Sequence, residues 1–211
     1  MRLRLLVLTA AYPSSHEPGR GIFIENLNRE LLEQGGAELS LTVVAPRVHS
    51  LDPASETRFG VEVRRFPYPS GGKRLKELDS PGALTLGGYF LSGLSQVLWE
   101  ARGGDFDAVL CHWVLPTGPI DWLSSFFIEC PFFLLANGSD LNRYAARSSF
   151  LRQASRLALN RATGVFAVSE DLRKAIETDY SPGVRQLEVV EMGVGEGFQP
   201  SDRGEAREAL G

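Results

Sequence analysis

The fold is decided by two apolar stretches, 3-LRLLVLT-9 and 39-LSLTVVA-45, and by the segment that joins them. Both stretches are short and nearly continuous in apolar residues, which is typical of strands buried on both faces of a sheet. Between them, residues 22–34 carry apolar side chains at helical spacing. Gly35 and Gly36 follow, as glycines commonly do after a helix. The region therefore predicts one strand–helix–strand unit of a parallel sheet.

The same alternation continues along the rest of the chain. Predicted strands lie at residues 61–66, 108–112, 132–136, 164–168 and 187–190, and predicted helices lie at 84–102, 118–127, 149–161 and 170–178. We expect the strand at 61–66 to lie at an edge of the sheet, because Pro67 and Pro69 follow it and proline cannot donate to a ladder. Strands that alternate with helices predict an α/β fold, a Rossmann-like doubly wound and mainly parallel sheet.

The last residues differ in composition from the rest. Residues 193–211 are rich in glycine, then polar, and then begin a helical fragment that stops at the final residue. We expect residues 1–192 to form one domain and residues 193–211 to be a linker toward a second domain that this sequence does not contain. The alternative is an ordinary frayed C-terminus.

The composition argues against several classes of protein. The 211 residues carry a net charge of −4, from 22 basic and 26 acidic residues, so the basic surplus of a protein that mainly binds nucleic acid is missing. Two cysteines and three scattered histidines suggest neither a disulfide framework nor a metal site, and no metal is expected. No stretch is long and apolar enough for a membrane span, and reduced thiols predict a cytoplasmic protein.

In an open parallel sheet, ligands bind beyond the carboxyl ends of the strands, so the residues that follow each strand are the candidates for a site. After the first strand, Gly19, Arg20 and Gly21 lead into the helix that starts at Ile22. A helix N-terminus presents free N–H groups and partial positive charge, and glycine lets that backbone approach a ligand closely. This loop could bind a phosphate, although glycines also precede helices for turn geometry alone.

Two further loops carry candidate polar residues. His112 ends one predicted strand, where a histidine is either a structural hydrogen-bonding group or a catalyst. The run Asn137-Gly138-Ser139-Asp140-Leu141-Asn142 follows the next predicted strand. This run forms either an Asx turn with a helix cap or a polar loop that binds hydroxyl groups.

Two familiar nucleotide-binding motifs are missing from the sequence. The dinucleotide motif Gly-x-Gly-x-x-Gly should directly follow the first strand, but Gly19 and Gly21 come about ten residues later. The second strand ends at Ala45-Pro46, without an acidic residue for a ribose. The phosphate loop Gly-x4-Gly-Lys-Ser/Thr does not occur either. These observations argue against a nicotinamide dehydrogenase and against an ordinary NTPase.

Several segments resemble glycosyltransferase family 4, whose members are retaining nucleotide-sugar enzymes with the GT-B fold. The matching segments occur in the same order as in the family and cover nearly the whole chain. They are Tyr12-Pro13 with Arg20-Gly21-Ile22-Phe23, Thr42-Val43-Val44-Ala45-Pro46, His112-Trp113 with Pro116 and Gly118, Gly138-Ser139-Asp140 with Asn142, Val168-Ser169 with Leu172, and Met192-Gly193-Val194 with Phe198-Gln199-Pro200. Each motif is weak alone, and their order and spacing make the resemblance specific.

The resemblance implies two Rossmann-like domains with the active site in the cleft between them. This chain would be the N-terminal, acceptor-side half of a retaining glycosyltransferase. The whole enzyme would move a sugar from a UDP- or GDP-sugar to a glycan or a lipid-linked acceptor. Its other half, the C-terminal domain, would hold the nucleotide-sugar, which is a substrate and not a cofactor. We therefore expect the 211-residue fragment to be inactive by itself.

The resemblance also implies roles for the candidate residues. Backbone N–H groups at Gly19 and Gly21 would lie near the donor diphosphate. The implied catalytic positions are Asp140, Asn137 and His112. The implied acceptor-binding residues are Arg20, Gly138, Ser139 and Asn142. Electrostatic stabilisation of the departing diphosphate would supply most of the catalysis, without a bound metal.

The sequence departs from the family pattern at two places. Asn137 stands where the family has a histidine before Gly-Ser-Asp, and an amide cannot take or supply a proton at neutral pH. The linker reads Met192-Gly193-Val194-Gly195 and lacks the two polar side chains of the family's Asn-Gly-Val-Asp. Two alternatives therefore stay open: a degenerate, non-catalytic domain that binds a glycan or a partner protein, and a GT-B-type sugar-nucleotide epimerase.

A weak peripheral membrane contact is a further expectation. Lys73, Arg74 and Lys76 form a basic cluster near Phe66 and Tyr68, and such a loop can contact anionic lipid at the inner face of the membrane. The acidic net charge of the chain opposes this interaction, and a solvated loop is the alternative.

Overall fold

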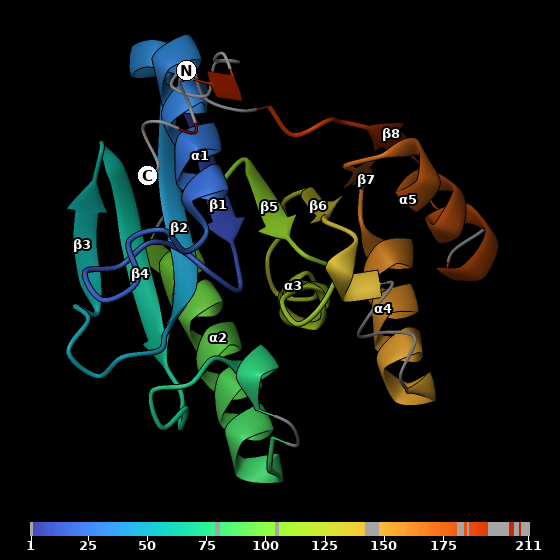
Figure 1. Cartoon of the computed structure of the whole chain (residues 1–211), viewed down its shortest axis with the longest axis horizontal. Coiled ribbons are helices and arrows are strands. Elements are labelled where there is room, and N and C mark those ends of the chain that lie inside the picture. The colour runs from blue at the N-terminus through green and yellow to red at the C-terminus, as the bar shows by residue number, and fades with distance from the viewer. Residues whose placement is uncertain are drawn as a thin grey trace.

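The computed structural model describes residues 2–78, 81–103, 106–141, 148–180, 184, 186–193, 203–204 and 207. Their main element is an eight-stranded sheet covered by helices (Figure 1). The strands are β1 (Leu3–Leu8), β2 (Leu39–Arg47), β3 (Ser55–Arg58), β4 (Val61–Pro67), β5 (Ala108–His112), β6 (Phe132–Ala136), β7 (Gly164–Ala167) and β8 (Leu187–Val189). The helices are α1 (Ile22–Gly35), α2 (Ala83–Gly103), α3 (Gly118–Ser124), α4 (Ser149–Arg161) and α5 (Glu170–Ala175).

The strand order is β3-β4-β2-β1-β5-β6-β7-β8, and every pair is parallel except β3 with β4. The order reverses at β1, whose neighbours are β2 and β5, as it does in doubly wound sheets. The predicted α/β fold, a Rossmann-like and mainly parallel sheet, is confirmed. The domain boundary predicted after residue 192 stays a prediction, because most of residues 194–211 lie outside the described part of the chain.

The prediction that the strand at 61–66 is an edge strand is wrong. β4 lies between β2 and β3, and the edge position belongs to β3, for which the sequence reasoning gave no strand. The sequence of β3, SETR, is short and polar, and its residues are exposed or half-buried, so it carries no apolar alternation to recognise. Pro67 is compatible with an interior strand because it is the last residue of β4.

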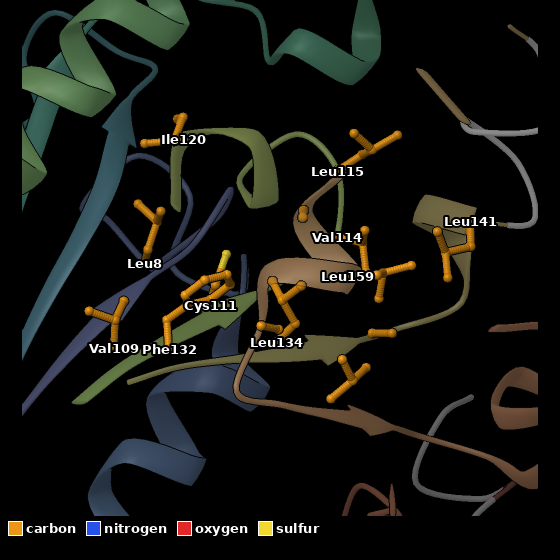
Figure 2. Packing of buried hydrophobic residues seen from close by; sticks show 14 of the residues in the cluster. Leu8, Val109, Cys111, Val114, Leu115, Ile120, Phe132, Leu134, Leu141 and Leu159 are labelled. Carbon is orange, nitrogen blue, oxygen red and sulfur yellow. The ribbon is translucent and has the colours of Figure 1, made fainter. Parts of the chain in front are cut away.

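Both faces of the sheet are buried, as the apolar strands predicted. Val7 and Val43 point to the face covered by α1, where they pack in one core with Ile24. Leu8 and Val44, each the next residue in its strand, belong to the opposite core, which is covered by α2, α3 and α4. Figure 2 shows this second core, where Ile120, Val114 and Leu159 surround the side chains of β5 and β6.

Helix α2 lies close to the sheet because glycine stands at its contact point. A Cβ atom on Gly93 would come within 2.8 Å of Ile120 Cδ1 and 3.2 Å of Phe66 Cζ.

The predicted helix at 118–127 ends earlier, at Ser124. The predicted helix at 170–178 widens after Ala175 into a turn that reaches Tyr180.

Two buried tyrosines give a matched test of this packing. The Tyr89 hydroxyl is buried and has no hydrogen-bond partner among the described residues, whereas the Tyr180 hydroxyl donates to Leu141 O at 2.7 Å. We expect Tyr89→Phe to raise the free energy of unfolding by about 1 kcal/mol and Tyr180→Phe to lower it by a similar amount, because only the second loses a hydrogen bond. Urea unfolding of the two variants measures both effects, and equal losses would contradict this account.

Candidate functional site

The predicted site residues follow three strands that are neighbours in the sheet. β1, β5 and β6 are adjacent and parallel, so their carboxyl ends lie at one edge. The segment after β1 leads to α1, the segment after β5 leads to α3, and residues 137–141 follow β6. The sheet therefore collects residues that are far apart in sequence on one side of the molecule (Figure 1).

The segment between β1 and α1 is held back against the sheet by a close backbone contact. Gly21 has a φ of 68°, and a Cβ atom there would lie 2.6 Å from Ala11 O. A side chain at this position is therefore excluded both by the left-handed backbone and by space. By contrast, a Cβ on Gly19 would meet no atom within 4 Å, so the segment itself gives no steric reason for that glycine.

The start of α1 already contains a carboxylate. Glu25 lies in the first turn of the helix and is buried, and its Oε1 accepts a hydrogen bond of 2.7 Å from Arg58 Nε. A negative charge at this place competes with a phosphate for the partial positive charge of the helix N-terminus. The pairing with Arg58 reduces that competition. Arg20 is half-buried in the same segment.

The loop after β5 is tightly hydrogen-bonded. Thr117 Oγ1 lies 2.6 Å from His112 O and 2.8 Å from Trp113 O, so its hydroxyl closes the loop onto the end of β5. Trp113 adopts a φ of 66°, which is uncommon for a residue with a large side chain, and its ring contacts Phe23 edge-on at 5.6 Å. This contact joins the β5 loop to the first turn of α1.

His112 lies beneath this loop and is fully buried. Neither ring nitrogen has a hydrogen-bond partner among the described residues. Burial lowers the pKa of the His112 imidazole to about 4, so the ring is neutral at pH 7. In this chain the side chain does not reach the surface of the candidate site.

The polar residues of the loop after β6 differ in their exposure and in their hydrogen bonds. Asn137 Nδ2 donates to Leu135 O at 3.2 Å, Gly138 has a φ of 90°, and Ser139 is exposed. Asp140 is buried, and its Oδ2 accepts a hydrogen bond of 2.6 Å from the Val114 N–H. The predicted residue Asn142 lies outside the described part of the chain.

Asp140 therefore joins the β6 loop to the β5 loop. Burial raises the pKa of its carboxyl, while backbone N–H groups, that of Val114 first among them, lower it, and the net shift is upward. Together with the Phe23–Trp113 contact, this hydrogen bond makes one connected unit of the three predicted segments. Of the predicted side chains, Ser139 is exposed and Arg20 half-buried, whereas His112 and Asp140 are buried.

The sequence reasoning missed a group of residues beside this unit. Arg65 of β4 is buried, donates from Nη2 to Pro13 O at 2.6 Å, and forms an ion pair with Glu56. Asp52 is also buried and accepts a hydrogen bond of 2.7 Å from His16 Nδ1. His16 comes from the predicted first loop, and a histidine so close to the glycines was the signal that could have extended the site.

A cavity of about 480 Å³ opens next to the His16–Asp52 pair. It lies between three segments: the one after β1, the one after β2 and the one after β4. Among the residues that line it are His16, Arg47, His49, Leu51, Tyr68 and Gly72. β2 and β4 run parallel to β1, so the cavity lies at the same carboxyl edge as the predicted residues.

The described residues contain no group of three or more histidine, cysteine or acidic side chains placed to hold a metal ion. The expectation that no metal is bound stays a prediction. No helix among the described residues is long and apolar enough to cross a membrane.

Comparison with known proteins identifies the family to which this fold and this site belong. The family described as "Glycosyl transferase 4-like domain" matches residues 19–193, which is most of the chain. The chain belongs to this family. A relative in Bacillus subtilis (strain 168), named "Putative teichuronic acid biosynthesis glycosyltransferase TuaC", is 30% identical to this glycosyltransferase 4-like domain over 189 residues. The alignment covers 82% of the chain and 46% of that relative, so the chain spans about half the length of the curated protein it matches.

Solved structures share the fold of this glycosyltransferase 4-like domain. Sucrose-phosphate synthase from Thermosynechococcus elongatus superposes with a TM-score of 0.69 at 13% identity, over 100% of this chain and 53% of that one. The UDP-GlcNAc 2-epimerase from Neisseria meningitidis gives 0.56 at 14% identity, over 88% of this chain and 45% of that one. At such identities the likeness concerns the fold, and it identifies the chain as GT-B-like.

The hydrogen bond between Asp140 and Val114 can be tested by its effect on stability. We expect Asp140→Ala to lower the free energy of unfolding by about 2 kcal/mol, because it leaves the buried Val114 N–H without its acceptor. Ser139→Ala is the matched control, since Ser139 is the exposed neighbour. Chemical unfolding of both variants measures the difference. An Asp140→Ala variant as stable as the control would contradict a role in joining the loops.

The buried His112 predicts a dependence of stability on pH. Its folded pKa of about 4 lies below the unfolded value, so the unfolded chain takes up the proton first. The histidine therefore lowers stability progressively as the pH falls from about 6.5 toward 4, by up to about 1.4 kcal/mol per pH unit. Comparing urea unfolding of the wild type and His112→Phe at several pH values isolates this contribution. A constant difference between the two proteins across that range would exclude it.

Proposed function

We propose that this chain is the acceptor-side half of a glycosyltransferase that moves a sugar from a nucleotide-sugar to a glycan or lipid-linked acceptor. The observation that carries the proposal is the connected unit of three loops at one edge of a sheet whose family is glycosyltransferase 4-like. A UDP- or GDP-sugar would be the donor. The remainder of the protein, a C-terminal domain, would hold that donor against this edge.

The proposed reaction retains the configuration of the sugar. The bond between the anomeric carbon and the diphosphate oxygen breaks, and the acceptor oxygen forms the new glycosidic bond from the same face. The acceptor's proton leaves with the diphosphate, so no separate base is required in this chain. The buried, neutral His112 fits this scheme because it has no charge to contribute at pH 7.

The roles proposed for individual residues follow the family resemblance and the contacts in the loops. Backbone N–H groups around Gly19 and Gly21 would face the diphosphate, and Arg20, Gly138, Ser139 and Asn142 would contact the acceptor or the transferred sugar. Asp140 acts through its hydrogen bond to Val114 and sets the position of both loops. Asn137 supports the β6 turn through Leu135 O.

The use of the Asn137 amide in the turn favours a second candidate function. One Nδ2 N–H of Asn137 is used within its own loop, and a degenerate domain that binds a glycan without chemistry would tolerate this arrangement. The epimerase alternative rests on likeness of fold alone. The 30% identical relative carries the name of a glycosyltransferase, which supports transfer over epimerisation.

Turnover assays on the longer parent protein test these alternatives. We expect it to form a glycosylated product from a UDP- or GDP-sugar and an acceptor, and the 211-residue fragment to form none, because half of the cleft is missing. Wild-type product formation would rule out the non-catalytic alternative. An inactive wild type that gains activity in Asn137→His would favour it, and conversion of UDP-N-acetylglucosamine without any acceptor would indicate an epimerase.

We also propose a cytoplasmic location with weak contact to the inner face of the membrane. Lys73 is exposed, whereas Arg74 forms ion pairs with Glu17 and Glu77 and is less available to lipid. A contact made by so few free charges would be weak. Sedimentation with anionic and neutral liposomes distinguishes it from no contact.

A further inference from the structure

The cavity at the ends of β2 and β4 has a positive lining. Arg47, His16 and His49 line it, and its lining contains no carboxylate. Asp52, the partner of His16, is 97% buried and is already engaged by Ser15 and His16. A hollow of about 480 Å³ is large enough for one sugar with a charged substituent.

Arg47 is the group in this cavity most available to a ligand. It is half-buried, yet its side chain has no hydrogen bond or ion pair to any other described residue. The other arginine next to the first loop, Arg65, already donates to Pro13 O and forms an ion pair with Glu56. A guanidinium that is partly desolvated and unpaired gains from an anion with two oxygens, such as a phosphate or a carboxylate.

The two histidines line the same cavity as Arg47. Asp52 accepts the hydrogen bond from His16 Nδ1 at 2.7 Å, which leaves Nε2 as the ring nitrogen free to contact a ligand. The ring of His49 stacks on His16 with centroids 5.1 Å apart and planes at 26°. Asp52 engages His16, whereas no described carboxylate engages Arg47, so an anion in the cavity would be attracted to the Arg47 guanidinium.

The rest of the cavity wall is fixed by its own hydrogen bonds. The Tyr68 hydroxyl donates to Lys73 O at 3.0 Å, and Ser70 Oγ donates to Val48 O at 2.9 Å. Ser70 Oγ also accepts from the Gly72 N–H at 3.2 Å. The Tyr68 and Ser70 hydroxyls of the loop after β4 are therefore already used within the protein, whereas the Arg47 side chain has no partner among the described residues.

We propose that this cavity is a binding site for an anionic group, a phosphate or a carboxylate, on the acceptor. Arg47 binds its oxygens, and His16 and His49 complete the site. The assignment to the acceptor rests on the proposed function. His16 belongs to the same segment as Gly21, which would face the donor, so the cavity would lie beside the reacting sugar. Anion binding itself does not depend on transfer activity.

The three histidines of the chain provide the measurement. NMR of their ring resonances at pH 6.5 is followed while glucose 1-phosphate, glucuronate or glucose is added to the 211-residue chain. We expect an anionic sugar to shift the signals of His16 and His49 to saturation and to leave the buried His112 unchanged. A response to only one of the two anions identifies the group as phosphate or as carboxylate.

Two variants separate the site from general charge effects. We expect Arg47→Gln to weaken binding about tenfold, because it removes the charged donor and disturbs no hydrogen bond of the fold. Arg29→Gln, an exposed arginine on α1 whose guanidinium lies over Phe59, should bind like the wild type. Equal shifts with glucose, equal shifts with chloride at matched ionic strength, or no shift with either anion would overturn the proposal.

Kinetics of the longer parent protein then test the assignment to the acceptor. There we expect Arg47→Gln to raise KM for an anionic acceptor about tenfold and to leave kcat nearly unchanged. If Arg47→Gln left KM unchanged although the wild-type cavity binds anions, the cavity would not be part of the acceptor site. A parent without transfer activity, with anion binding retained, would contradict the proposed function and not the site.

Discussion

The arrangement of the candidate site depends on one buried cation, Arg65. Its guanidinium lies between β3 and the segment after β1, bound to Glu56 on one side and to Pro13 O on the other. A buried charge is tolerated only when it is paired and hydrogen-bonded, so this arginine constrains both partners strongly. It holds the β1 segment, with Gly21 and His16, across the ends of β2 and β4, and the blue segment in Figure 1 follows this course. Together with the His16–Asp52 hydrogen bond, it fixes the position of this segment relative to the cavity.

The other half of the site is organised by contacts between loops. The Asp140–Val114 hydrogen bond and the Phe23–Trp113 ring contact connect segments that follow β6, β5 and β1. These contacts use side chains that a motif comparison would assign to chemistry. In the fold, Asp140 and His112 are buried, and the exposed positions are Ser139 and Gly19. A motif can therefore mark the place of a candidate site while its most polar side chains lie below the surface.

The sequence was sufficient for most of the parallel strands, because buried parallel strands are apolar over most of their length. The strands at 108–112 and 132–136 were predicted with their observed limits, and the mainly parallel arrangement followed from strand–helix alternation. β3 could not be predicted, since SETR has no apolar residue and pairs only because β4 lies beside it. The pairs Asp52–His16 and Arg65–Pro13 join residues that are 36 and 52 positions apart in the sequence. A local sequence pattern cannot predict contacts between residues so far apart. The three site loops were found because they all follow apolar strands.

The strand β3 has a consequence for how this chain behaves in a concentrated solution. It ends the sheet with four residues, of which Glu56 and Arg58 are charged and already held by Arg65 and Glu25. A short edge occupied by charged side chains is a poor template for the backbone of another molecule. The polar hairpin thus shields the long apolar strands behind it from edge-to-edge aggregation.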